Sequence, residues 1–138
     1  MLDISQLKIV SEQSEFDFDF IYDELKMTYW ANWRTKEQVT LSFKNSYAKM
    51  VFYEQQPIAF ARIITDWVIF GYLADVVVTE KFRGKGVACL LLTALLNTPE
   101  VAEVKNCCWQ LRMHIICIKN LDSVHYYILK KIMEKMTS

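Results

Sequence analysis

A pair of glycines at residues 84 and 86 constrains this chain most. The segment LADVVVTEKFRGKGVACLLL, residues 73–92, contains two of the three glycines in the sequence, after a run of valines and before a run of leucines. The order predicts a strand, a glycine turn and a helix. The first N–H groups of such a helix have no partner within it, and Gly84 and Gly86 let an anion approach them closely while Arg83 and Lys85 add positive charge. We therefore predict a phosphate-binding turn.

The rest of the chain predicts a mixed α/β domain. We expect a strand in residues 3–13, a helix in residues 14–30, and a second helix opened by a Thr35/Gln38 capping box with Val39, Phe43 and Tyr47 on one face. A hairpin over residues 49–66 turns at residues 55–57, and a further strand spans residues 70–78.

The helix after the glycines is expected to end near Asn97. Its apolar stripe consists of Val87, Leu90, Leu91, Ala94 and Leu95. A strand at residues 110–118 and a helix at residues 123–136 complete the chain. Because most strands follow one another directly, we expect a largely antiparallel sheet flanked by helices.

Composition narrows the function classes. With 138 residues and 53% hydrophobic residues, the chain predicts a single domain over residues 1–138. Its 16 basic and 16 acidic residues cancel, which favours neither a nucleic acid nor a membrane as partner. The N-terminus has no signal-peptide pattern and no apolar segment is long enough to span a membrane, so a cytoplasmic location is expected. The four cysteines form no C-x-x-C pair, so we expect buried reduced thiols and no metal site.

Residues 83–88, RGKGVA, fit the arrangement R-x-x-G-x-A, which resembles the turn that holds the pyrophosphate of acetyl-coenzyme A in the GCN5-related N-acetyltransferase (GNAT) family. The longer stretch FARIITDWVIFGYLADVVVTEKFRGKGVACLLL and the aromatic residues Tyr29, Trp30 and Trp33 are similar to a bacterial branch of that family. The resemblance covers about the first 105 residues. Residues 106–138 form an atypical tail.

The resemblance implies an α+β fold of the GNAT type, acetyl-coenzyme A as donor, and transfer of its acetyl group to an amine. The cofactor-binding residues that it implies are Val76, Val77 and Val78 along the pantetheine arm and Arg83, Gly84, Lys85, Gly86, Val87, Ala88 and Cys89 around the pyrophosphate. The acceptor is a small molecule or a peptide; a small amine, a peptide N-terminus, a lysine and an antibiotic all stay open. A homodimer is a candidate assembly. No catalytic residue is assigned.

Several of these residues have a second interpretation. Gly84 and Gly86 could simply make a tight turn. Asp75, expected with Tyr29, Trp30 and Trp33 to face the acceptor, could instead act as a cap or form a pair, and the two tryptophans could pack in the core. Six acidic residues between positions 12 and 24 form either a lip that attracts a cationic amine or, the better-supported interpretation, a solvated helix face.

The resemblance breaks after residue 105. This branch carries A-T-x-D-A-H-x-L-Y-x-x-F-G-F there, with a tyrosine expected to protonate the departing thiolate, whereas residues 109–123 read WQLRMHIICIKNLDS. Trp109 and Met113 each have a single codon, and both codons end in G. The codons of the next residues, Gln110 and His114, begin with CA. Read one nucleotide earlier, both places therefore give GCA, which encodes alanine. The other codons can spell the whole family segment. We hypothesise that the tail, from residues 104–108 onward, is a frameshifted C-terminus.

Two functions therefore remain open. The first is an acetyl-coenzyme A-dependent N-acetyltransferase whose activity the altered tail impairs, since no motif marks Tyr126 or Tyr127 as a replacement acid. The second is a non-catalytic acyl-coenzyme A-binding domain.

Overall fold

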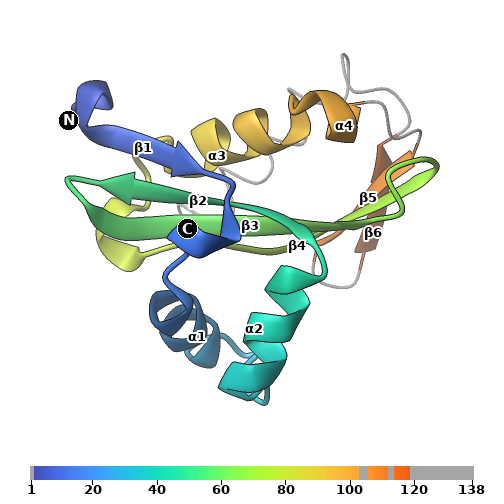
Figure 1. Ribbon diagram of the computed structural model, residues 1–138, viewed down its shortest axis with the longest axis horizontal. Helices are drawn as coiled ribbons and strands as arrows, with labels where there is room; N and C mark the ends of the chain where they lie inside the picture. The colour runs from blue at the N-terminus through green and yellow to red at the C-terminus, as the bar shows by residue number, and fades with distance from the viewer. Residues whose placement is uncertain (1, 103–105, 112–113, 119–138) are drawn as a thin grey trace.

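The computed structural model describes residues 2–102, 106–111 and 114–118. A single sheet has α1 and α2 on one face and α3 and α4 on the other (Figure 1). The strands are β1 (Leu7–Val10), β2 (Tyr47–Tyr53), β3 (Gln56–Thr65), β4 (Phe70–Val78), β5 (Asn106–Leu111) and β6 (His114–Ile118). The helices are α1 (Phe18–Lys26), α2 (Lys36–Lys44), α3 (Val87–Leu96) and α4 (Pro99–Ala102), with short 3-10 turns η1 (Ile4–Gln6), η2 (Gln13–Glu15) and η3 (Glu80–Phe82).

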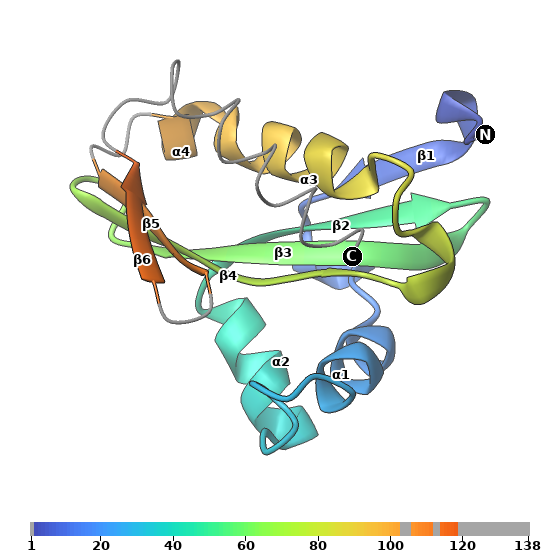
Figure 2. The same cartoon turned by 180° about the vertical axis from the view of Figure 1, so that it is seen from behind.

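The sheet confirms the predicted mixed, largely antiparallel architecture. Its strand order follows the chain, β1-β2-β3-β4-β5-β6, and all neighbours are antiparallel except β4 and β5, which are parallel. The hairpin of β5 and β6 lies at the end of the sheet where β4 begins (Figure 2). In the described part of the chain, the pairing between β4 and β5 covers only residues 70–73 of β4. The second half of β4 is therefore left without a described strand on that side.

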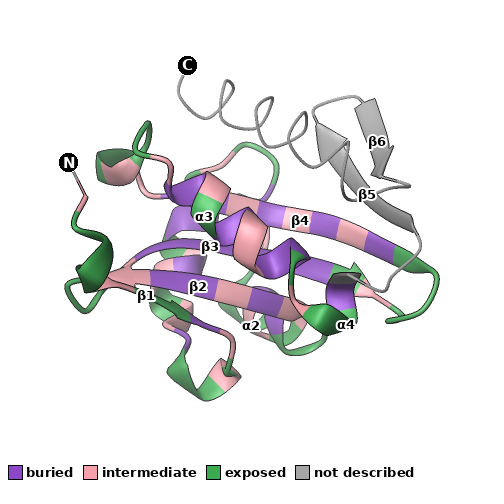
Figure 3. Cartoon of the chain, turned by 90° about the horizontal axis from the view of Figure 1, so that it is seen from above, coloured by how far each residue is buried: buried purple, intermediate pink, exposed green. Residues whose placement is uncertain are grey.

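Two apolar clusters fill the space between the sheet and its helices. One joins α3 to β3 and β4 through residues such as Ile63 and Leu91, and the other joins α1 and α2 to the opposite face through Phe43 and Phe60. Figure 3 shows the buried stripe of α3 over the buried centre of the sheet. Each element is thus held by the face that it buries.

Helix α3 spans the residues expected, but the predicted stripe is partly wrong. Leu90 is 42% exposed, and the buried side chains are Val87, Ala88, Leu91, Leu92, Leu95 and Leu96. Because α3 is apolar all round, its spacing alone does not fix which face packs on the sheet.

The predicted capping box is present. The Thr35 hydroxyl accepts from the Gln38 amide at 3.1 Å, and the Gln38 side chain accepts from the Thr35 amide at 2.9 Å. Val39 and Phe43 are buried as expected, but Tyr47 is not on this helix. It begins β2 because α2 ends at Lys44 with Asn45 as its cap.

Three other boundaries differ from the prediction. Strand β1 and helix α1 are shorter than expected, because 3-10 turns flank β1 and the Asp17 side chain caps α1 through the Phe20 amide at 3.0 Å. The hairpin turns at Glu54 and Gln55, which have φ of 49° and 69°, and residues 56–57 already belong to β3. Paired left-handed residues match the twist of a two-residue hairpin turn.

The single strand predicted at residues 110–118 is also wrong. These residues contribute to both β5 and β6, which pair as a hairpin with Leu111 opposite His114. The helix predicted at residues 123–136 lies outside the described residues. Within the described ranges, no helix is long and apolar enough to cross a membrane.

Candidate functional site

Among the described residues, the glycine turn (residues 83–89) has several peptide N–H groups without an acceptor at the start of α3. Gly84 and Gly86 have left-handed φ of 75° and 82°, and Gly86 is the N-cap of the helix with no side-chain cap. The Arg83 amide donates to the Glu80 carbonyl at 3.3 Å, but no described residue accepts from the amides of residues 84–89. A Cβ built on Gly86 meets no atom within 4 Å. The turn is therefore an open, positively polarised cup.

Two basic side chains frame this cup. The Arg83 guanidinium donates through Nε to the Val78 carbonyl at 2.9 Å, which fixes it at the end of β4. The Lys85 ammonium lies over the Phe82 ring, 5.4 Å from its centre. Positive charge therefore accompanies the free amides, as an anionic ligand requires.

A cavity of about 700 Å³ lies between β4 and the C-terminal end of α1. Its volume is in the range of small-molecule sites. The residues that line it are Glu24, Met27, Thr28, Tyr29, Trp30, Val76, Val77, Val78, Thr79, Glu80, Lys81 and Arg83. The cavity thus brings together residues that the sequence analysis assigned separately, the β4 residues and Arg83 for the donor and Tyr29 and Trp30 for the acceptor.

The aromatic wall is a turn after α1. The Thr28 hydroxyl donates to the Leu25 carbonyl at 2.7 Å and accepts from the Ala31 amide at 3.1 Å, which closes the turn. The rings of Tyr29 and Trp30 meet edge to face with centres 5.6 Å apart. Both tryptophans are exposed, so the alternative that they pack in the core is wrong. Trp33 is not among the lining residues of the cavity; its indole N–H donates to the Trp30 carbonyl at 3.1 Å.

Asp75 lies at a β-bulge and is held by two arginines. Phe60 pairs with Val77 and Arg62 with Ala74, so two residues of β4 face one residue of β3. Asp75 has a left-handed φ of 53°, a strained conformation for a residue other than glycine. Its carboxylate accepts from Arg62 Nε at 2.6 Å and from Arg34 at 2.8 and 2.9 Å. These contacts match the alternative that Asp75 pairs with a cation.

This ion-pair cluster (Arg34, Arg62 and Asp75) connects the two walls of the site. Arg62 comes from β3, and Arg34 follows the aromatic turn in the chain. Asp75 precedes the β4 residues that line the cavity. One carboxylate therefore ties the aromatic turn to the strand opposite it.

Sequence reasoning missed a carboxylate in the cavity. Glu24 is buried, and its Oε1 atom accepts from the Thr79 hydroxyl at 2.8 Å. The sequence analysis grouped Glu24 with the solvated acids of this segment, where Asp19 indeed pairs with Lys36 at the surface. The missed signal is helical spacing, because Glu24 falls on the same face as buried Ile21 and Leu25.

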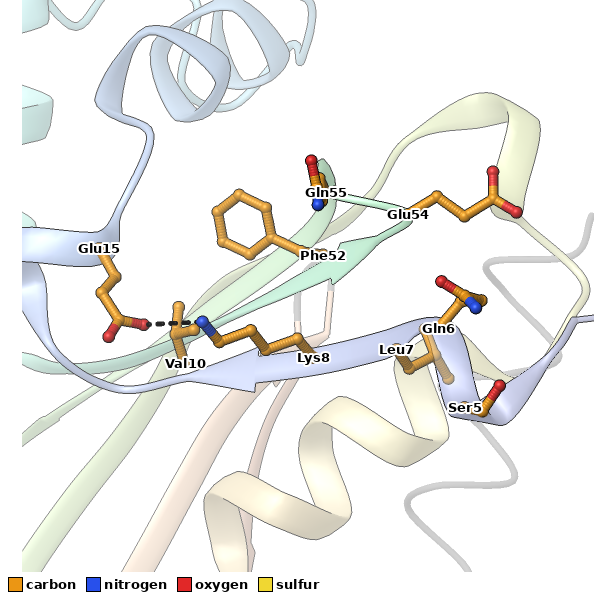
Figure 4. Close-up of a pocket in the computed structure, with 9 residues that line it drawn as sticks. All are labelled: Ser5, Gln6, Leu7, Lys8, Val10, Glu15, Phe52, Glu54 and Gln55. Atoms are coloured by element: carbon orange, nitrogen blue, oxygen red, sulfur yellow. Dashed lines mark ion pairs between the residues drawn. The ribbon is translucent and has the colours of Figure 1, made fainter.

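A second cavity, of about 500 Å³, lies beside the edge strand β1 (Figure 4). It contains none of the residues assigned from the sequence, and the ion pair in its wall joins Lys8 to Glu15 at 3.9 Å. In the described ranges, no three His, Cys, Asp or Glu residues gather as metal ligands would. The cavity between α1 and β4 is therefore the candidate site.

Known structures share this fold. A protein from Xanthomonas campestris pv. campestris assigned to the GNAT family is 23% identical, covers 91% of this chain and 82% of its own, and superposes with a TM-score of 0.75. The ribosomal-protein-S18-alanine N-acetyltransferase of Escherichia coli is 15% identical, covers 91% and 75%, and has a TM-score of 0.65. A GNAT acetyltransferase from Elizabethkingia anophelis, solved with acetyl-coenzyme A bound, is 15% identical, covers 92% and 74%, and has a TM-score of 0.63.

Sequence comparison agrees with the fold. No curated protein matches the chain. The family model for the acetyltransferase (GNAT) family matches residues 7–130, which includes most of the segment set apart above as an atypical tail. The chain therefore belongs to the GNAT family, whose enzymes take the acetyl group from acetyl-coenzyme A.

Proposed function

We propose that this chain transfers an acetyl group from acetyl-coenzyme A to an amine in the cavity between α1 and β4. The proposal rests on the backbone amides of residues 84–89, for which no described residue is a hydrogen-bond acceptor. They lie at the start of α3, next to Arg83, which lines the cavity. A diphosphate fits this cup because it accepts several N–H bonds at once and carries the charge that the helix end favours. Bound acetyl-coenzyme A supplies an activated thioester.

The second half of β4 is suited to the extended arm of that donor. Residues 76–78 line the cavity, and the described strands leave them unpaired on the β5 side. Their peptide groups would pair with the amides of the pantetheine arm, and an N–H there would stabilise the negative charge that develops on the thioester oxygen. Tyr29 and Trp30 would receive the amine from the opposite wall. The acid that protonates the leaving thiolate is unassigned.

An acyl-coenzyme A-binding domain without turnover is the second candidate. It is favoured by the difference between residues 109–123 and the tyrosine-bearing segment expected there from the resemblance to the bacterial branch. The two candidates share the donor site, so binding does not separate them. Release of free thiol from acetyl-coenzyme A in the presence of primary amines does.

Donor binding is tested by unfolding with and without acetyl-coenzyme A. At a concentration of about one hundred times its dissociation constant, the ligand should add about 2.7 kcal/mol to the free energy of unfolding. Gly86→Val places a branched side chain over the cup and should remove this increment, measured against the variant's own unliganded baseline. Lys85→Ala should weaken binding, whereas Lys44→Ala, an exposed lysine on α2, should not. Full stabilisation of Gly86→Val would refute the proposed donor site.

A further inference from the structure

The carboxylate of Glu24 is buried, and no described residue is its cationic partner. Its residue is 9% exposed and lies between side chains of α1 that are fully buried. Removing a charged carboxylate from water is costly unless hydrogen bonds or an opposite charge compensate it. The Thr79 hydroxyl provides one hydrogen bond, to Oε1. In the described part of the chain, no lysine or arginine forms an ion pair with Glu24.

The other buried acid of the site shows what a compensated carboxylate looks like. Asp75 has two guanidinium groups within 3 Å of its oxygens. Glu24, in contrast, lines the cavity and keeps Oε2 free of described donors. Glu24 therefore lines this cavity with hydrogen-bonding capacity that no described residue fills.

Thr79 fixes this carboxylate in place. Its amide donates to the Ile58 carbonyl of β3 at 2.8 Å, so its backbone is anchored to the sheet directly after β4. Its hydroxyl then reaches across the cavity wall to α1. A short, fixed hydroxyl holds Glu24 close to the β4 residues where the thioester is expected.

Aromatic rings complete the environment of a cation. Tyr29 and Trp30 line the same cavity and are set edge to face. Ring faces attract an ammonium group even where the rings are exposed, as Tyr29 and Trp30 are here. Two basic residues, Lys81 and Arg83, also line the cavity. Arg83 is already bound to the Val78 carbonyl, on the side of the glycine turn. The α1 side of the cavity thus combines a buried anion with aromatic walls.

We propose that Glu24, positioned by Thr79, binds the ammonium group of the acceptor, and that the acceptor class is a primary alkylammonium with an aromatic or apolar body. This inference rests on the proposed function and assigns the specificity of its acceptor side. A carboxylate hydrogen-bonded to a cation discriminates against a neutral analogue of the same shape, because the neutral ligand leaves the buried charge unpaired.

The test is calorimetric titration of the full chain, first with coenzyme A and then, with coenzyme A bound, with phenethylammonium chloride or uncharged phenethyl alcohol. Wild type should bind the ammonium form at least about tenfold more tightly than the alcohol. Glu24→Gln keeps the size of the side chain and an oxygen for Thr79, and should weaken binding of the ammonium about tenfold or more without changing that of coenzyme A. Asp23→Asn, the exposed neighbour on α1, is the matched control and should bind like wild type.

Thr79 is tested by a pair of variants. Thr79→Ser keeps the hydroxyl and should bind phenethylammonium like wild type, whereas Thr79→Val should weaken it; a purely structural role would not separate the two once both are shown to be folded. Equal affinity of Glu24→Gln and wild type for the ammonium, or no binding of it by wild type, overturns the inference. Failure of wild type to bind coenzyme A would instead overturn the proposed function, and with it this assignment.

Discussion

Replacing Asp75 with asparagine tests the ion-pair cluster that joins the two walls of the site. Asparagine adopts left-handed φ about as readily as aspartate, so the backbone at the bulge is not the variable. The side chain keeps its size and one acceptor oxygen. What the substitution removes is the negative charge between Arg34 and Arg62, whose side chains are 18% and 9% exposed.

The expected loss follows from burial. Removing one partner of a buried ion pair leaves uncompensated charge and costs about 3–5 kcal/mol. A domain of this size has a total stability of about 5–15 kcal/mol, so Asp75→Asn should remove a large share of it. At about 3 °C per kcal/mol, the melting temperature should fall by about 9–15 °C.

Urea unfolding followed by circular dichroism measures this change as a lower midpoint at an unchanged m-value. The double variant Asp75→Asn with Arg34→Met removes one of the stranded charges and should recover about 1 kcal/mol or more. Asp23→Asn, which makes the same chemical change at the surface, should stay within about 0.5 kcal/mol of wild type. A loss below about 1 kcal/mol for Asp75→Asn would show that water solvates the two guanidinium groups without Asp75, and that the ion-pair cluster does not hold the two walls together.

Three further measurements test other parts of the fold. Thr35→Ala removes one half of the capping box and should lower the free energy of unfolding, measured by urea unfolding, by about 1 kcal/mol. An exposed substitution elsewhere on α2 should lower it less. Leu91→Ala, in the cluster under α3, should cost about 2.7–5 kcal/mol, and exposed Leu90→Ala much less; equal losses would mean that the buried face of α3 is assigned wrongly. Hydrogen bonds from the amides of Val68 and its two successors lower the pKa of Asp66 below its ordinary value of 3.8. Their contribution to stability is therefore present above that value and lost as the pH falls through the lowered pKa, so the difference in unfolding free energy between wild type and Asp66→Ala should shrink in acid.

Local chemistry could be predicted from the sequence where it depends on near neighbours. The capping box of Thr35 and Gln38, the strand before the glycines and the helix after them all follow from residues a few positions apart. The glycine turn was likewise found from composition, because a chain with so few glycines places two of them where left-handed φ is required. The family resemblance added the expected donor and the residues around it.

Features set by distant contacts could not be predicted in this way. The pairing of Asp75 with Arg34 and Arg62 depends on how three elements pack, and the burial of Glu24 depends on a cavity wall contributed by β4. The face of α3 was misassigned for the same reason. The frameshift hypothesis for the tail stays a prediction, which the nucleotide sequence of the gene will test: the codons from residue 109 onward, read one nucleotide earlier, must spell the family segment.

The residue at the bulge links the two walls of the cavity that we propose as the donor and acceptor sides. Glycine would adopt the left-handed φ at position 75 without strain, as Gly86 does at the start of α3, but it would bring no charge. Aspartate is strained in this conformation, but its carboxylate binds Arg62 of β3 and Arg34, which follows the aromatic turn. The bulge just before the β4 residues that line the cavity and the contact to Arg34, just after the aromatic turn, thus involve one side chain. A change at Asp75 should therefore disturb the aromatic wall of the cavity more than the glycine turn, which is anchored separately through Arg83 to the Val78 and Glu80 carbonyls.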